Sequence, residues 1–242
     1  MIQNNIIFNI MVNDKPVSEY RKDFNTYIEG RKGSEFKLQI INNNSKRILV
    51  VPSIDGLSVL DGKAADYNSS GYIINGFSSL IIDGWRISLE EVRKFFFTKK
   101  NSSYANKTNQ DTSNLGVIGL AVFTEKVKPV IRNTSPYWVD SDTHKWWGPS
   151  YTYSATYNAD YNAEYSAMSL SDTIKRSAVG TGMGDKISSL CSESSFDKED
   201  QPFTVFCIYY YERKELERMG VLSVKSSKPK QKPFPGQFCI EV

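Results

Sequence analysis

The chain has 242 residues, with 30 Lys and Arg against 27 Asp and Glu and a formal net charge of +3. This length can bury a real core as one large all-β domain or two small ones, and the nearly balanced charge gives no overall field toward nucleic acid or an anionic membrane. With 14 Tyr and 13 Phe beside many Asn and Ser residues, the composition favours strands joined by polar turns.

Apolar patterns predict three strands near the N-terminus. Residues 6–12 alternate between apolar and other residues, and residues 35–40 alternate in the same way. Residues 48–51 form a continuous β-branched and leucine run, which is typical of a strand buried on both faces. Because the polar turn at 42–45 separates the last two segments, we expect them to form a hairpin.

Two Asp-Gly dipeptides come next and predict tight turns, because each supplies positive φ angles. They are Asp55-Gly56 and Asp61-Gly62, and only a short strand or a tight loop fits between them. Paired carboxylates also serve as the catalytic groups of glycosidases, but the glycine after each aspartate favours the turn role. Strand patterns return at Tyr72–Ile74 and Leu80–Ile82.

Ser88 followed by Glu91 matches a capping box and predicts a single helical turn. Residues 101–114 read as a polar loop, and residues 117–123 as another strand buried on both faces. About seven or eight short strands separated by turn residues are typical of a sandwich or a jelly roll. We therefore expect an all-β fold, with an antiparallel β-sandwich or jelly-roll-like domain over residues 1–125.

Residues 126–175 break this pattern, and we expect an aromatic-rich irregular segment, either a long loop or an insertion. In Tyr151–Tyr165 a tyrosine recurs at every fourth residue from Tyr153 onward. On a helix these rings would form one stripe; alternatively, the segment is irregular and is ordered by a neighbouring molecule. Local helix propensity does not decide between the two.

We expect residues 176–242 to form a C-terminal part that completes the core. Phe203–Tyr211 predicts a strand that packs on the core, and Glu212–Met219 predicts a short helix that ends at Gly220. The basic, proline-containing residues from Lys225 onward predict an extended tail. The lysines of this tail suit a solvated linker better than a site for an acidic surface.

Few residue patterns in the chain suggest catalysis. His144 is the only histidine, so a multi-histidine metal site is impossible, and a Ser-His-Asp triad would depend on His144 beside Asp140 and Asp142 without a GxSxG motif. The glycine-rich run Gly180–Gly184 lacks the spacing of a phosphate-binding loop and favours a glycine turn or bulge. We expect no enzymatic activity.

Cysteine usage and the N-terminal residues add further exclusions. Cys191, Cys207 and Cys239 are odd in number and contain no CxxC pair, so neither a disulfide framework nor a zinc ribbon is indicated, and we expect no metal or other cofactor. Reduced thiols of a cytoplasmic product are the simplest interpretation. Residues 1–15 lack a basic n-region, and no apolar run approaches a membrane span, so we expect neither a signal peptide nor membrane association.

The strongest binding signal is a cluster of large rings in loop-like sequence. Exposed aromatic side chains can stack on sugars or anchor a protein interface. So many rings so close together are hard to bury in one small core, and an exposed apolar patch usually indicates a partner. The candidate binding residues are Trp138, Trp146, Trp147, Tyr151 and Tyr153.

Several blocks of the sequence resemble a family of uncharacterised bacterial and phage proteins, which are virion structural proteins when a phage encodes them. The blocks are Pro16–Tyr20, Tyr27–Phe36, Ser53–Lys63, Ser69–Tyr72, Gly84–Arg86, Ser103–Ala105, Gly116–Gly119, Gly180–Gly182 and Ile208–Gly220. The Asp-Gly-Leu block at Asp55–Leu57 is the most specific of them. Tyr151–Tyr165 is not part of this pattern, and the resemblance assigns no site residues.

The resemblance implies a structural protein of a phage particle, associated with the capsid or the tail and synthesised in the host cytoplasm. Its partners would be other virion proteins in a multi-copy assembly, with no nucleic acid and no membrane bound. The alternative is a carbohydrate-binding module that uses the Trp and Tyr loops on a host surface glycan. A glycoside hydrolase is a third and weaker alternative.

Overall fold

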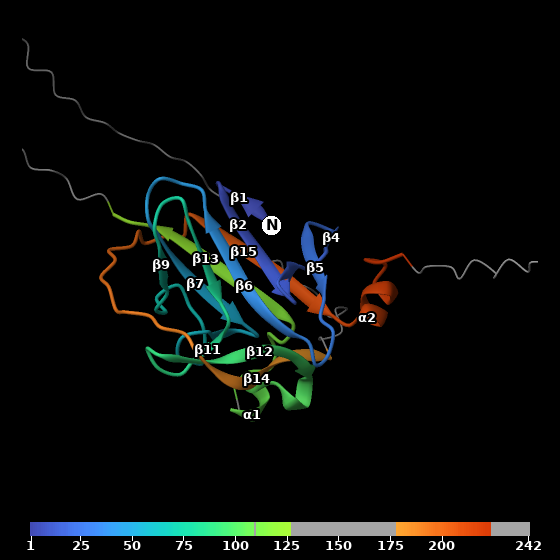
Figure 1. The fold of residues 1–242 in the computed structure, drawn as a ribbon. Coiled ribbons are helices and arrows are strands. Elements are labelled where there is room, and N and C mark those ends of the chain that lie inside the picture. The colour runs from blue at the N-terminus through green and yellow to red at the C-terminus, as the bar shows by residue number, and fades with distance from the viewer. Residues whose placement is uncertain (109, 127–177, 224–242) are drawn as a thin grey trace, which may run out of the picture. The chain divides into compact units, whose positions relative to one another are not determined.

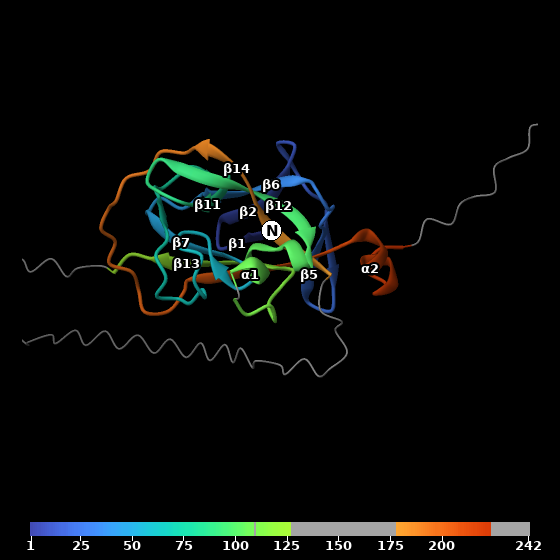
Figure 2. The ribbon, with the colours of Figure 1, turned by 90° about the horizontal axis from the view of Figure 1, so that it is seen from below.

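Two β-sheets pack face to face around one hydrophobic core (Figure 1). The computed structural model describes residues 1–108, 110–126 and 178–223, and these belong to one unit. Figure 2 shows the two layers, with β6, β12 and β14 on one side and β7 and β13 on the other. The all-β sandwich expected from the strand patterns is confirmed.

The first sheet has eight strands in the described part of the chain. Its central path runs β1-β2-β6-β12-β11, with β3 beside β2, β10 beside β6 and β14 beside β12. The strands are β1 (Ile2–Gln3), β2 (Ile6–Val12), β3 (Lys15–Pro16), β6 (Glu35–Asn42), β10 (Ser78–Ile82), β11 (Gly84–Arg86), β12 (Glu91–Lys99) and β14 (Val179–Ser188).

The second sheet has seven described strands in the order β4-β5-β15-β13-β7-β8, and β9 also pairs with β7. The pair β5–β15 is parallel, whereas the other pairs described in this sheet are antiparallel. The strands are β4 (Glu19–Lys22), β5 (Asn25–Glu29), β7 (Ile48–Ile54), β8 (Leu57–Ser58), β9 (Tyr72–Ile74), β13 (Val117–Thr124) and β15 (Thr204–Tyr211).

Helical structure among the described residues is limited to three short pieces. They are the 3₁₀ helix η1 (Lys100–Ser102), α1 (Tyr104–Lys107) and α2 (Arg213–Arg218). The helix predicted before Gly220 is α2, and Gly220 follows it with a φ of +67°. No helix of the described ranges is long and apolar enough to cross a membrane.

Every second side chain along the strands points into the core. In β2 and β6, Phe8 and Leu38 are fully buried, while the residues beside them in sequence are partly exposed. Rings dominate the inter-sheet space: Phe36 stacks on Phe97 at 4.3 Å between ring centroids, and Phe8 meets Phe206 of the other sheet edge-on at 5.6 Å.

The hairpin predicted from residues 35–40 and 48–51 is wrong. β6 belongs to the first sheet and β7 to the second, so the turn at 42–45 crosses between the layers. The β9–β10 connection also crosses, because β9 pairs with β7 and β10 pairs with β6. The local apolar patterns predicted both strands correctly. Which strand each of them pairs with depends on how the two sheets pack around the core.

Asn42 holds these two crossings together. Its side chain is fully buried, and its Nδ2 donates to the carbonyl oxygens of Lys46 at 2.9 Å and Asn75 at 3.0 Å. Its Oδ1 accepts from the backbone N–H of Asn44 at 3.0 Å. One amide thus satisfies backbone groups of both connections where they leave their sheets.

The helical turn predicted at Ser88 is also wrong. The Ser88 hydroxyl accepts from the N–H groups of Glu90 and Glu91, each at 3.2 Å, as a capping residue does. The chain nevertheless bends there and enters β12 at Glu91, because Val92 and Phe95 are drawn into the core as strand residues. The polar contact therefore closes the β11–β12 turn instead of starting a helix.

The domain boundaries expected at 125/126 and 175/176 stay predictions. Residues 127–177 lie outside the described residues, as does the tail from residue 224 onward. β14 and β15, which follow in the C-terminal part, belong to the first and second sheet respectively.

Replacing Asn42 by Ala should lower the free energy of unfolding by about 2 kcal/mol, because buried backbone groups of two turns lose their hydrogen bonds. Denaturant unfolding monitored by fluorescence measures the loss. Asn43→Ala is the matched control, since Asn43 is exposed in the same turn. Equal unfolding midpoints for the two variants would show that Asn42 does not hold the crossings.

Candidate functional site

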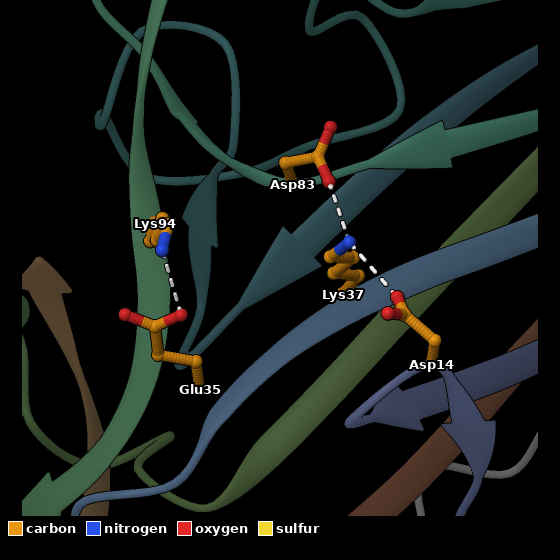
Figure 3. A network of polar contacts seen from close by, with 5 residues as sticks. All are labelled: Asp14, Glu35, Lys37, Asp83 and Lys94. Carbon is orange, nitrogen blue, oxygen red and sulfur yellow. Dashed lines mark hydrogen bonds and ion pairs between the residues drawn. The ribbon is translucent and has the colours of Figure 1, made fainter. Parts of the chain in front are cut away.

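A charged groove of about 230 Å³ lies on the outer surface of the first sheet. Five of its lining residues, Asp14, Glu35, Lys37, Asp83 and Lys94, carry charges and face one another (Figure 3). Lys37 and Glu35 point outward because they alternate with the buried Phe36 and Leu38 along β6. Asp14 lies in the β2–β3 turn, Asp83 between β10 and β11, and Lys94 on β12.

The charges in this groove are paired. The Lys37 ammonium lies 3.0 Å from the Asp14 carboxylate and 3.5 Å from that of Asp83, and Lys94 lies 2.9 Å from Glu35 (Figure 3). The hydrogen bond to Asp14 is the largest of the effects that raise the pKa of Lys37. Because these side chains are partly exposed, each pair contributes only about 0–1 kcal/mol to stability.

The charged groups of the groove can recognise polar groups of a partner. Three carboxylates against two ammonium groups leave one net negative charge. Ser, Cys and His are absent from its lining. Its chemistry is therefore that of a surface for polar recognition.

A second polar cluster lies inside the sandwich, around Asp55 in the β7–β8 turn. Its carboxylate accepts from the backbone N–H of Gly116 at 2.8 Å, the N–H of Thr181 at 2.7 Å and the hydroxyl of Tyr210 at 2.5 Å. The hydroxyl groups of Thr181 and Tyr210 lie 2.9 Å apart. Asp55 is 1% exposed, and Thr181 and Tyr210 are fully buried.

Burial changes the acid–base properties of this cluster. Loss of water raises the pKa of Asp55 to about 6, and the hydrogen bonds from Tyr210, Thr181 and Gly116 hold it below the value that burial alone would give. Burial and the negative charge of Asp55 raise the pKa of Tyr210 well above its usual range. Because no substrate can reach these groups, we assign the cluster a structural role.

The turn role predicted for the Asp-Gly dipeptides is confirmed. Asp55 and Gly56 have φ angles of +55° and +79°, and Gly62 has a φ of +69°. Asp61 is exposed and accepts from the N–H of Lys63 at 3.2 Å, whereas Asp55 is buried. The buried network around Asp55 was not predictable from the sequence, because its three donors are remote in the chain.

The glycine-rich run Gly180–Gly184 lies in β14 and serves close packing. A Cβ on Gly182 would lie 2.3 Å from the tip of the Phe96 ring, so a larger residue there would displace that ring. The pairing of β12 with β14 shifts register between Arg93 and Phe95, which matches the expected bulge. The run is backbone of a sheet rather than a loop that could surround a phosphate.

The sequence-predicted binding residues Trp138, Trp146, Trp147, Tyr151 and Tyr153 lie outside the described residues. So do His144, Asp140 and Asp142. Sequence reasoning missed the charged groove. The alternation at 35–40 already placed Glu35 and Lys37 on an outward face, but their partners come from turns and strands whose position the sequence does not reveal.

Neither metal chemistry nor a known relative indicates an activity. In residues 1–108, 110–126 and 178–223, no group of three or more His, Cys, Asp or Glu side chains is placed to hold a metal ion. Comparisons with protein-family models, curated proteins and solved structures find no match. The candidate site among the described residues is the charged groove.

The free energy of unfolding should depend on pH because of Asp55. Its pKa is 3.8 in the unfolded chain and about 6 in the folded chain. Asp55 therefore contributes most to the free energy of unfolding below pH 4, and this contribution falls as the pH rises through 6. The decrease should be about 3 kcal/mol, at 1.36 kcal/mol for each pKa unit.

Chemical unfolding of the wild type and of Asp55→Asn between pH 3.5 and about 7 measures this decrease as a change in their difference. Other carboxyl groups titrate alike in both proteins and cancel. Parallel stability curves for the two proteins would contradict the assignment.

Proposed function

We propose that this chain is a non-catalytic structural protein of a phage particle, associated with the capsid or the tail, that acts by binding other virion proteins. The resemblance of blocks such as Asp55–Leu57 to phage and bacterial proteins supports the virion setting. The proposed location is therefore the virion, after synthesis in the host cytoplasm.

The observation that carries the binding role is a patch of exposed apolar side chains. Ile87 and Leu89, in the β11–β12 turn, are 44% and 49% exposed, and Leu190 is 81% exposed. The backbone N–H of Cys191 donates to the carbonyl of Leu89 at 2.8 Å, so the two segments lie side by side. Exposed apolar patches of this kind usually mark contacts with another protein.

The polar groups of the described residues also favour binding over catalysis. Every buried side-chain nitrogen and oxygen in these ranges has a hydrogen-bond partner. The buried carboxylate of Asp55 is enclosed by its donors, and the charged groups of the groove around Lys37 are paired with one another. This arrangement stabilises a scaffold and offers no activated nucleophile.

We also propose that Trp138, Trp146, Trp147, Tyr151 and Tyr153 form the attachment segment. Their rings are concentrated where the strand pattern of the sequence stops. In protein interfaces a few Trp and Tyr residues usually supply most of the binding energy.

Mass spectrometry of purified particles tests the virion proposal directly. In particles of a phage that encodes the chain, its peptides should remain after density-gradient purification, at a ratio to the major capsid protein that is constant between preparations. A chain found only in the lysate supernatant would overturn the proposal.

The double substitution Trp146→Ala with Trp147→Ala should prevent incorporation into particles, because it removes two large interface side chains. The unfolding midpoint should stay unchanged. His144→Ala, in the same segment, is the control and should leave incorporation intact. A hydrolytic activity lost in His144→Ala would instead favour an enzyme.

A second candidate function, glycan binding, is favoured by one groove. It measures about 620 Å³ and lies along β9, and its lining includes Ser70, Tyr72, Asn75, Ser192 and Glu193. Hydroxyl, amide and carboxylate groups beside a ring suit a sugar. Retention of the purified chain on immobilised host polysaccharide, without incorporation into particles, would favour this function.

A further inference from the structure

Three turns and the residue before β15 meet at one end of the sandwich (Figure 1). Asn44, in the β6–β7 turn, donates from its Nδ2 to the carbonyl of Asn4, in the β1–β2 turn, at 3.0 Å. The carbonyl of Asn44 accepts from the N–H of Phe77, in the β9–β10 turn, also at 3.0 Å. The Nδ2 of Asn4 donates to the carbonyl of Phe203 at 3.3 Å. We call this surface, formed by residues 4–5, 43–45, 75–77 and 203, the turn cluster.

The residues of the turn cluster are all uncharged, although 24% of the residues in the chain carry a charge. The longer segments to which they belong also contain no Asp, Glu, Lys or Arg; these are residues 2–13, 38–45, 67–82 and 201–211. Charged residues such as Lys46 only border these segments. The surface therefore favours a ligand that is polar and uncharged, because a charged ligand would lose water without gaining an opposite charge.

Three side-chain amides of the turn cluster are free to bind a ligand. Asn5, Asn43 and Asn75 are exposed, and their side chains make no hydrogen bond within the described residues. They lie close together, because the N–H of Asn43 donates to the carbonyl of Asn5 and the buried Asn42 amide donates to that of Asn75, each at 3.0 Å. Asn43 and Asn75 lack a positive φ, so the backbone does not require asparagine there. Each free amide offers both a donor and an acceptor.

Phe77 presents its ring to solvent beside these amides. It is 76% exposed and has a φ of +53°. This backbone conformation favours Gly or Asn and disfavours a bulky side chain. Neither burial nor backbone geometry accounts for a phenylalanine at this position, whereas a ligand that packs on its ring does.

The turn cluster continues into the groove of about 620 Å³ along β9, because Asn75 belongs to both. Ser70 and Ser192 add hydroxyl groups to the lining of this groove. Arg47 of the lining is already paired with a carboxylate, and Glu193 is exposed, so the groove disfavours an anionic ligand. A ligand several units long can therefore contact the turn cluster and the groove at once.

From these observations we infer that the turn cluster and the β9 groove form one binding site for a neutral oligosaccharide. A sugar ring packs its apolar face on Phe77, and its hydroxyl groups exchange hydrogen bonds with the amides of Asn43 and Asn75. Sugars combine apolar ring faces with hydroxyl groups that both donate and accept, and this surface offers a partner for each. The inference deepens the second candidate function, glycan binding, and rests on it; it is independent of the virion proposal.

An oligosaccharide array probed with the full chain tests the site. The neutral set holds hexasaccharides of glucose, mannose, galactose and N-acetylglucosamine, and the anionic set holds those of galacturonate and sialic acid. At least one neutral sugar should bind, and the anionic sugars should not. Isothermal titration calorimetry with the sugar that binds then gives the Kd of each variant. Binding of anionic sugars alone would overturn the inference.

Phe77→Gly should weaken sugar binding at least tenfold, because it removes the ring. Glycine accepts a φ of +53° without strain, so the unfolding midpoint should stay equal or rise, which excludes misfolding as the cause. Phe24→Gly is the matched control, since Phe24 is also exposed, has a φ of +63° and lies in the β4–β5 turn, outside the turn cluster. It should leave the Kd unchanged, whereas Asn43→Ala should raise it.

The outcomes separate this inference from both proposed functions. Sugar binding that Ser192→Trp abolishes by filling the groove, but that Phe77→Gly leaves unchanged, would overturn the inference and leave glycan binding standing. A chain that binds no sugar of the array would overturn the inference and the glycan candidate, but not the virion role. A Phe77→Gly variant that binds sugar normally but is missing from particles would show that the turn cluster contacts a protein, and the inference would be wrong.

Discussion

The buried carboxylate of Asp55 is the constraint on which the described structure depends. Its donors, Gly116, Thr181 and Tyr210, are 61, 126 and 155 residues away in sequence. Gly116 directly precedes β13, and the other two lie in β14 and β15. A carboxylate without water is tolerated only when such donors are in place. The network therefore links β14 of the first sheet to the second sheet. Asp55 can be buried only when all four of these distant segments are packed correctly.

Local sequence patterns predicted most elements but not their partners. The alternation at 6–12 and 35–40, the run at 48–51 and the helix before Gly220 all correspond to observed elements. The two wrong predictions, the hairpin of residues 35–51 and the helical turn at Ser88, concern segments whose structure depends on tertiary contacts. Asn42 binds both connections that cross between the sheets, and the residues after Ser88 pack in the core as part of β12. Periodicity tells which face of a strand is buried, but not which strand lies beside it.

The candidate surfaces were less predictable for the same reason. Glu35 and Lys37 are visible in the sequence as outward residues of a strand, yet Asp14, Asp83 and Lys94 reach them only through the sheet order. A site on the surface of a sheet is formed by residues of neighbouring strands, which are far apart in the sequence.

The parallel pairing of β5 with β15 has a consequence for synthesis. Thr26 of an early strand pairs with Ile208 of a late one, and β15 is the strand that connects β4 and β5 to β13. Until the ribosome has released Thr204–Tyr211, β13 lacks one of its two hydrogen-bonded neighbours and β5 lacks its parallel partner. Such long-range pairing forms slowly and leaves strand edges unpaired while the chain is being made. The second sheet is therefore completed only after β15 has been synthesised.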